Sequence, residues 1–310
     1  MVNRIIIMKK AIIALSLIWA VAAQAQIFNV ESVHRVSTPQ NDNTVMQAVA
    51  ISPQGDYLLL STDTKQGLVK WDLATSGMTT ITNDAGAGSN VCINEDGSQI
   101  VYGEVSYKNK RRHEAVKSID LTSGKKQTLV KATRDLQGFA IENATVATVA
   151  NGNVKMHTLK KGAARSTSRP VLTHHHLKLY ITRDGKTTEF APNGADKRYI
   201  WASLSPDGSR VLYYVSGYGA FVCGIDGNNI IGMGNLTAPK WWDDNTIVGM
   251  NEVDDEYSII ASSIVARTLD GTEQVLTSED VIATYPLPSS KSGKIAFSTP
   301  DGEIYLITVD

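Results

Sequence analysis

The chain has 310 residues, of which 42% are hydrophobic, with 30 basic and 31 acidic side chains and a formal net charge of -1. This near balance gives no overall field that would draw the chain to nucleic acid or to a membrane surface, so we expect no nucleic-acid partner. The apolar content is sufficient for a large core, and length alone suggests about two domains.

The first 25 residues read as a signal peptide. Lys9 and Lys10 precede an apolar stretch, Ala11 to Ala23, and a small-x-small cleavage site follows it at Ala23-Gln24-Ala25. We predict cleavage after Ala25 and export to the periplasm or beyond. The stretch is short for a membrane span, and no span is expected after cleavage. The alternative is an uncleaved membrane anchor. No cysteine follows the site to carry a lipid, and residues 26–310 are predicted to form one domain.

A hairpin with fixed spacing recurs along the rest of the chain. An apolar residue is followed, across a short polar turn, by the first apolar residue of a second strand. The turns include Ser52-Pro53-Gln54-Gly55 and Ser205-Pro206-Asp207-Gly208, in which Pro and Asp favour a turn and Gly allows positive φ. The six apolar pairs are Ile51 and Leu58, Ile93 and Ile100, Ile141 and Val146, Leu204 and Val211, Trp242 and Ile247, and Pro288 and Ile295.

A second hairpin follows the first in most copies, with turns such as Asp72–Met78 and Asp120–Lys126. The repeat is thus about 40 residues with four strands, which is typical of a β-propeller blade. We predict an all-β, six-bladed propeller of four-stranded antiparallel blades. The last copy is one strand short, and Val30–Ser37 is predicted to supply that strand and close the ring. The predicted units cover residues 44–82, 87–131, 136–191, 199–235, 237–278, and 281–310 with 30–37.

The unit resembles the TolB-type propeller repeat, a WD40-like Pro-Asp repeat. Its pattern of a strand, Ser-Pro-Asp-Gly, a strand and an Asp-Leu-x-x-Gly hairpin is matched by Ser205–Gly208, Asp72-Leu73 and Asp120-Leu121. The WD-repeat family fits less well, because only Trp71-Asp72 matches it. The resemblance implies a secreted propeller, with envelope proteins, peptides or glycans as partners, and it says little about function.

The loops that break the repeat are the candidate recognition elements. In a propeller they are expected on the face opposite the Ser-Pro-x-Gly turns. The second unit carries Glu104–Glu114, with Lys110, Arg111 and Arg112. The third carries Asn151–Thr173, with five further basic residues and His174-His175-His176 after it. Because these units are adjacent, we expect one basic rim that binds an anionic group, with ordinary solvated charge as the alternative.

Acidic and aromatic residues complete the candidate surface. The fifth unit carries Asn251–Ser258, which includes Asp254 and Asp255. Solvated acid is the default interpretation of this cluster and a calcium site the alternative. The aromatic candidates for stacking on a carbohydrate or peptide are Tyr107, Trp201, Tyr218, Trp241 and Tyr257, each of which could instead pack between blades.

The sequence contains little that indicates catalysis. No Gly-x-Ser-x-Gly motif is present, which argues against a complete prolyl-oligopeptidase-type enzyme. His174 and His176 are minor metal candidates, because alternate residues on a strand share a face. No metal or other cofactor is otherwise expected. Cys92 and Cys223 fall in predicted strands of non-adjacent units, so two buried free thiols are favoured over a disulfide.

The sequence therefore favours a monomeric, non-catalytic binding module, periplasmic or secreted, that recognises an envelope protein, peptide or glycan through the face at the channel entrance. The alternative is a metal-assisted propeller enzyme, a lyase or hydrolase acting on an acidic polysaccharide. For that alternative, His174, His176, Arg111 and Arg112 are the residues to test.

Overall fold

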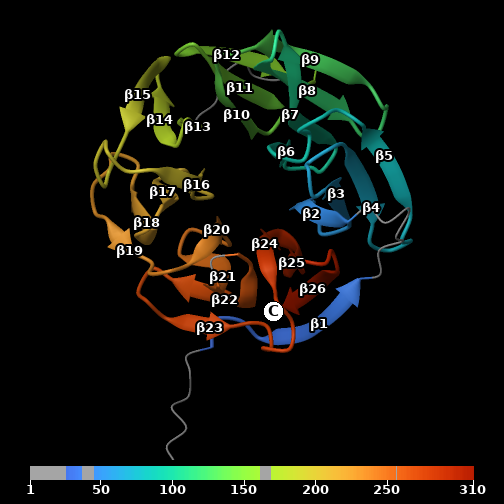
Figure 1. Ribbon diagram of the computed structural model, residues 1–310, viewed down its shortest axis with the longest axis vertical. Helices are drawn as coiled ribbons and strands as arrows, with labels where there is room; N and C mark the ends of the chain where they lie inside the picture. The colour runs from blue at the N-terminus through green and yellow to red at the C-terminus, as the bar shows by residue number, and fades with distance from the viewer. Residues whose placement is uncertain (1–25, 37–44, 161–168, 256) are drawn as a thin grey trace, which may run out of the picture.

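Seven antiparallel sheets form a ring of blades in the computed structural model, which describes residues 26–36, 45–160, 169–255 and 257–310 (Figure 1). The expected all-β propeller is confirmed, with seven blades in place of six. Blade 1 comprises β2 (Met46–Ile51), β3 (Tyr57–Thr62), β4 (Leu68–Asp72) and β5 (Met78–Thr82); blade 2 comprises β6 (Val91–Ile93), β7 (Gln99–Lys108), β8 (Arg111–Asp120) and β9 (Lys126–Thr133).

Blades 3 and 4 each have three strands among the described residues. Blade 3 comprises β10 (Leu136–Glu142), β11 (Thr145–Ala150) and β12 (Asn153–Thr158); blade 4 comprises β13 (Val171–His175), β14 (Lys178–Arg183) and β15 (Lys186–Phe190). Blade 5 comprises β16 (Tyr199–Leu204), β17 (Arg210–Val215), β18 (Gly219–Gly224) and β19 (Ile231–Gly232); blade 6 comprises β20 (Thr237–Trp241), β21 (Thr246–Asp254), β22 (Ile259–Thr268) and β23 (Glu273–Val275).

Blade 7 joins the two ends of the chain. It comprises β24 (Thr284–Ser289), the 3₁₀ turn η1 (Ser290–Ser292), β25 (Lys294–Ser298) and β26 (Ile304–Val309), with β1 (Val30–Val36) as its outer strand. The strand β1 pairs antiparallel with β26 from Val30 opposite Val309 to Val36 opposite Ile304. The predicted closing strand is thus confirmed as far as Val36, and Ser37 lies outside the described residues.

The six-blade count was wrong because residues 136–191 form two blades. The Asn151-Gly152 turn after β11 starts a hairpin whose second strand is β12, so this segment is not an irregular insertion. A new sheet then begins at β13. The strand β13 is the innermost described strand of blade 4, but it runs in the opposite direction to the innermost strands of the other blades. Among the residues that the structure describes, blade 4 therefore has no first hairpin of the kind that defined the predicted repeat.

The Ser-Pro-x-Gly segments are structural. Ser52 is fully buried, and its Oγ accepts hydrogen bonds from the backbone amides of Asp56 (3.0 Å) and Tyr57 (3.1 Å). Ser205, also fully buried, accepts from the amide of Arg210 at 3.0 Å in the same way. Gly208 follows with φ of 76°, a conformation that favours glycine. Serine at this position therefore satisfies backbone donors at the start of the second strand.

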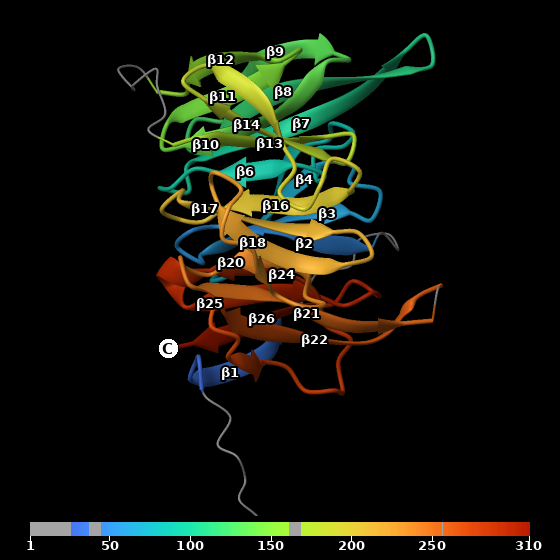
Figure 2. The same ribbon diagram turned by 90° about the vertical axis from the view of Figure 1, so that its left-hand side faces the viewer.

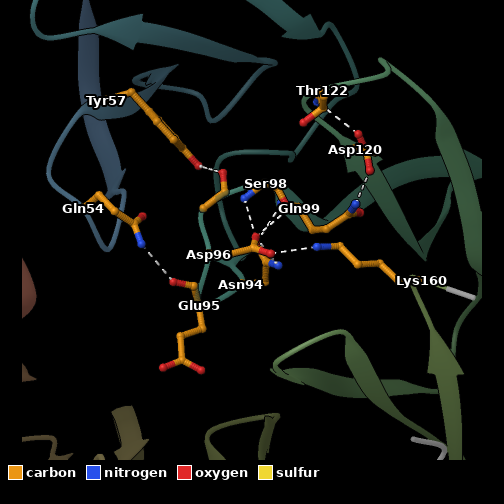
Figure 3. Close-up of polar contacts among 11 residues, drawn as sticks. Gln54, Tyr57, Asn94, Glu95, Asp96, Ser98, Gln99, Asp120, Thr122 and Lys160 are labelled. Atoms are coloured by element: carbon orange, nitrogen blue, oxygen red, sulfur yellow. Dashed lines mark hydrogen bonds and ion pairs between the residues drawn. The ribbon is translucent and has the colours of Figure 1, made fainter. Parts of the chain in front are cut away.

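We call the face that carries these turns the turn face, and the opposite face the loop face. Neighbouring blades are joined on the turn face, as Figure 3 shows: Gln54 donates to the carbonyl of Glu95 at 3.2 Å, Tyr57 donates to the carbonyl of Gly97 at 2.8 Å, and Lys160 pairs with Asp96 at 2.7 Å. Lys160 and Ser98 hold the pKa of the Asp96 carboxyl well below its usual value. These contacts fix one blade against the next.

The core lies between the blades, where the sheets pack face to face. Among its largest fully buried side chains are Trp71, Tyr102, Tyr199, Tyr213 and Phe297. Both cysteines are free thiols, as favoured from the sequence. Cys223 is buried as expected, whereas Cys92 is half-buried on the innermost strand β6.

Candidate functional site

A cavity of about 580 Å³ opens on the loop face between blades 2, 3 and 4. It combines side chains from the hairpin β7–β8, the link between β9 and β10, the start of β10 and the turn between β13 and β14. Its basic wall consists of Arg111, Arg112, Arg134, His174, His175 and His176. Three arginines and three histidines from neighbouring blades thus surround one cavity.

The hairpin β7–β8 is the longest element beside this cavity. Its two strands stay paired from Gln99 opposite Asp120 to Lys108 opposite Arg111, with Asn109 and Lys110 in a left-handed turn at the tip. Figure 2 shows this hairpin and β21–β22 both extending beyond the ring on the same side. The regular pairing holds Arg111 and Arg112 on a strand, which positions them better than an irregular loop would.

The acidic side chains of the cavity already have partners. Glu104 pairs with Lys117 at 2.9 Å, and Glu114 pairs with Arg112 at 3.0 Å. Lys117 also pairs with Asp84 at 2.9 Å, and its pKa is raised although burial acts against this. By contrast, Arg111 and Arg134 have no carboxylate within ion-pair distance among the described residues. The cavity therefore presents unneutralised positive charge.

The three histidines take different roles. His174 donates from Nε2 to the backbone carbonyl of Tyr199 at 2.8 Å, toward blade 5. His175 and His176 pack ring against ring, with centroids 3.8 Å apart. Burial, with the adjacent His176, lowers the pKa of His175, so its ring is neutral near pH 7.

The structure does not bring His174 and His176 together as metal ligands. The strand β13 ends at His175, and His176 has φ of 50° in the turn, so the alternation expected for a strand does not reach it. Within the ranges that the structure describes, no three His, Cys, Asp or Glu side chains are grouped as a metal site requires. The site is better suited to binding an anion through hydrogen bonds and charge.

Other predicted residues lie around the cavity without lining it. Tyr107 is 73% exposed and lies opposite Arg112 on the hairpin, next to the Lys110 tip. Tyr218 is 64% exposed in the turn between β17 and β18, where the Lys197 ammonium sits 4.5 Å from its ring centroid. These two tyrosines are available to a partner on the loop face.

The two predicted tryptophans are more involved in packing. Trp201 lies in β16, half-buried, with its ring 5.2 Å from that of Tyr214 in an edge-on arrangement. Trp241 lies in β20 and donates from Nε1 to the carbonyl of Ser203 at 3.4 Å, which is a weak hydrogen bond. Trp241 lines the central channel rather than the loop-face cavity.

The acidic residues of β21–β22 lie on blade 6, outside the cavity. Asp255 accepts hydrogen bonds from the backbone amides of Tyr257 (3.1 Å) and Ser258 (2.8 Å), which lowers its pKa and shapes the hairpin end. Asp254 ends strand β21 beside it. Tyr257 itself is 95% exposed. The cluster thus forms an exposed acidic and aromatic tip.

The expected single basic rim was only partly correct. Lys155 is on β12, Lys160 is on the turn face in its ion pair with Asp96, and Arg169 donates to the carbonyl of Ser205 on the same face. Lys161 and Arg165 lie outside the described residues. Sequence reasoning missed two residues that line the cavity: Arg134, in the link between β9 and β10, and Gln137, the second residue of β10. A signal was available for Arg134, because it lies in the link that enters the first strand of blade 3, on the loop face.

Comparisons with known proteins show the fold and no family. No protein-family model matches the chain, and no curated protein matches it. Among solved structures, U3-55K aligns with a TM-score of 0.63 and 7% identity over 89% of this chain and 98% of that one. A chain of the mitotic checkpoint complex aligns with a TM-score of 0.58 and 11% identity over 96% and 98%.

An oligogalacturonate lyase in complex with manganese aligns more loosely, with a TM-score of 0.48 and 15% identity over 84% of this chain and 76% of that one. For U3-55K and the chain of the mitotic checkpoint complex, at 7% and 11% identity, the similarity shows a shared propeller fold alone. In the part of the chain that the structure describes, no helix is long and apolar enough to cross a membrane.

Proposed function

We propose that the protein is a non-catalytic binding module, exported as its N-terminal sequence predicts, that holds an acidic peptide segment of a partner on the loop face. The observation that supports this proposal most directly is the cavity between blades 2, 3 and 4. There Arg111 and Arg134 remain without carboxylate partners while Glu104 and Glu114 are paired. A carboxylate of the partner would supply the missing charge.

The two long hairpins favour a peptide over a small ion. Their ends carry large exposed side chains, Tyr107 on β7–β8 and Val253, Tyr257 and Ile260 on β21–β22, with exposed fractions from 52% to 95%. Exposed tyrosines and arginines are enriched among the residues that dominate protein–protein binding energy. A partner that entered the cavity would meet Tyr107 beside it, and a partner long enough to cross the loop face would also meet the end of β21–β22 on blade 6.

The test is a binding titration of the full mature chain with a poly-glutamate peptide, followed by calorimetry. Wild type is expected to bind, with affinity that falls as salt rises, because exposed charges are screened. R111E/R112E is expected to bind at least about tenfold more weakly, since charge-assisted hydrogen bonds contribute about 1.5–3 kcal/mol each.

A matched control is available on the opposite face. Lys125 and Lys126 lie at the turn between β8 and β9, and K125E/K126E changes the net charge by the same amount. This variant is expected to bind as wild type does. If both double variants lose binding equally, net charge rather than the cavity accounts for it. If R111E/R112E binds poly-glutamate as tightly as wild type, the proposal is wrong.

The same purified protein also tests the alternative function, a metal-assisted enzyme. Purified protein that carries a stoichiometric transition metal, lost in H174A/H176A, and that cleaves a polyuronide would replace the binding module with an enzyme. The binding module predicts that oligogalacturonate is at most bound through Arg111 and is recovered uncleaved.

A further inference from the structure

The innermost strands place one layer of equivalent residues around the central channel. The equivalent positions follow from strand register. Close to the turn of the first hairpin, Trp241 pairs with Ile247 in blade 6 and Leu204 pairs with Val211 in blade 5. The layer consists of the residue directly before Trp241, before Leu204 and before the matching residue of each other blade. The six residues at this position are Ala50, Cys92, Ala140, Ser203, Lys240 and Leu287. Five are small or apolar, and Lys240 alone is charged.

Two cavities confirm that this layer faces the channel. One of about 310 Å³ is lined by Ala50, Ser203, Lys240 and Leu287, and another of about 400 Å³ by Cys92, Ala140, Ser203 and Lys240. Ser203, Leu204 and Lys240 are common to both, so Lys240 stands where the two volumes meet. The larger one shares Asn90 and Phe139 with the loop-face cavity, which places the channel beside it.

Lys240 has no neutralising partner. Its side chain is accessible to solvent, and no carboxylate of the described residues lies within ion-pair distance of it. The surrounding protein nevertheless lowers the pKa of its ammonium, because burial disfavours the charged form. The nearby Cys92 thiol has a pKa raised by burial to about 11, so it is neutral near pH 7 and supplies no negative charge.

The local backbone is strained in a way that aims this side chain. Pairing between β20 and β21 shifts register between Thr237 and Lys240, which leaves Ala238 and Pro239 in a bulge. Ala238 has φ of 46°, an uncommon value for a residue other than glycine. Bulges often redirect a side chain next to a binding site. In blades 5 and 7 the equivalent bulges, at Trp201 and Tyr285, present Ser203 and Leu287 instead.

We propose that the central channel binds a carboxylate attached to an apolar group, with Lys240 as its ion-pair partner. The apolar part would lie against channel-wall residues such as Ile51, Leu204, Trp241 and Leu287. The carboxylate would meet an ammonium that lines both cavities and has no carboxylate within ion-pair distance among the described residues, beside apolar walls that reduce the screening of the pair by water. Small side chains at Ala50 and Ala140 leave room for the ligand.

Other ionisable groups border the same space. Glu142 and Arg169 line the larger cavity on the side of blades 3 and 4, and both already have interaction partners, Arg169 with the carbonyl of Ser205 among them. Lys240 is the one charged side chain of its layer, so the channel fits a ligand with a single carboxylate, whether from a short fatty acid or from the C-terminus of an apolar peptide.

Calorimetric titration of the full mature chain separates these two sources. Hexanoate is compared with 1-hexanol, and a peptide ending in leucine is compared with its C-terminal amide. Wild type is expected to bind at least one carboxylate and neither uncharged analogue. K240M is expected to weaken binding about tenfold or more, the loss expected when a charge-assisted hydrogen bond is removed, and K240R to retain most of it.

A second measurement needs no variant. Acetic anhydride labels lysines, and mass spectrometry reports the extent at each site. Saturating hexanoate or the leucine peptide is expected to protect Lys240 while leaving the exposed Lys125 unchanged. R111E/R112E is expected to bind hexanoate normally, so loss of the loop-face site and loss of the channel site are distinguishable. The proposal is overturned if K240M binds like wild type, if no carboxylate binds, or if Lys240 is not protected.

Discussion

Replacing Phe28 by alanine should loosen the closure of the ring. Phe28 is 6% exposed, and its ring centroid lies 4.8 Å from that of Trp242 in an edge-on contact with blade 6. Its amide donates to Gln274 Oε1 at 2.8 Å, and its carbonyl accepts from Gln274 Nε2 at 2.9 Å. This residue therefore fastens the segment before β1 to blade 6 while β1 itself completes blade 7.

The cost follows from burial. Truncation of a buried phenylalanine to alanine costs about 3–5 kcal/mol, and the lost aromatic pair falls within that range. For a chain of this size, about 3 kcal/mol corresponds to a fall in melting temperature of about 5 °C, because the unfolding entropy grows with chain length. The backbone hydrogen bonds to Gln274 are retained in the variant, so the change measures side-chain packing alone.

Urea unfolding followed by tryptophan fluorescence and by circular dichroism measures the loss. The control is V33A on the strand β1 that follows, where the side chain is 43% exposed and a change below about 1 kcal/mol is expected. If F28A loses no more stability than V33A, Phe28 does not fasten the ring. If the two probes diverge, blade 7 unfolds separately from the rest.

Two further predictions concern packing and acid stability. A Cβ on Gly249 would lie 2.5 Å from Leu236 Cγ and 3.1 Å from the Thr237 carbonyl oxygen. G249A should therefore lower the free energy of unfolding by about 1–3 kcal/mol, seen as a lower urea midpoint with an unchanged m-value. An unaltered midpoint would contradict this packing. Lys160 and Ser98 hold the pKa of the Asp96 carboxyl below its usual value of 3.8. The contribution of this carboxylate to folding stability is therefore present above pH 3.8 and is lost as the pH falls below it. Wild type should therefore be more stable than D96N at about pH 5 and should lose that advantage toward about pH 2, and a constant gap across this range would argue against the interaction.

The repeat was predictable because turn chemistry is local. Serine, proline and glycine in Ser205–Gly208 satisfy backbone donors and positive φ within a few residues, so the sequence pattern carries the structure. The closing strand was predictable because the last unit lacked one strand and Val30–Ser37 was the segment left to supply it. The extra blade was not, because β13 enters its sheet from the opposite direction without the turn used as an anchor.

The site was predicted less well, because it depends on contacts between blades. Arg111 and Arg112 were identified from a charged hairpin, but the placement of His174 depends on the carbonyl of Tyr199, which is distant in sequence. Lys160 was predicted to belong to the same basic surface, but its pairing with Asp96 places it on the turn face. Lys240 carried no motif at all, and only the register of six strands shows that it is the single charge in its layer.

The pairing of β1 with β26 also has a consequence for the order of events during synthesis. The first strand of the ring pairs with β26, more than 260 residues later, so blade 7 cannot be completed until β26 has been synthesised. Until then β1 and the edge of the growing array are unpaired and open to other strands. Earlier blades can stack as they are made, whereas closure is a single late step that involves the whole polypeptide.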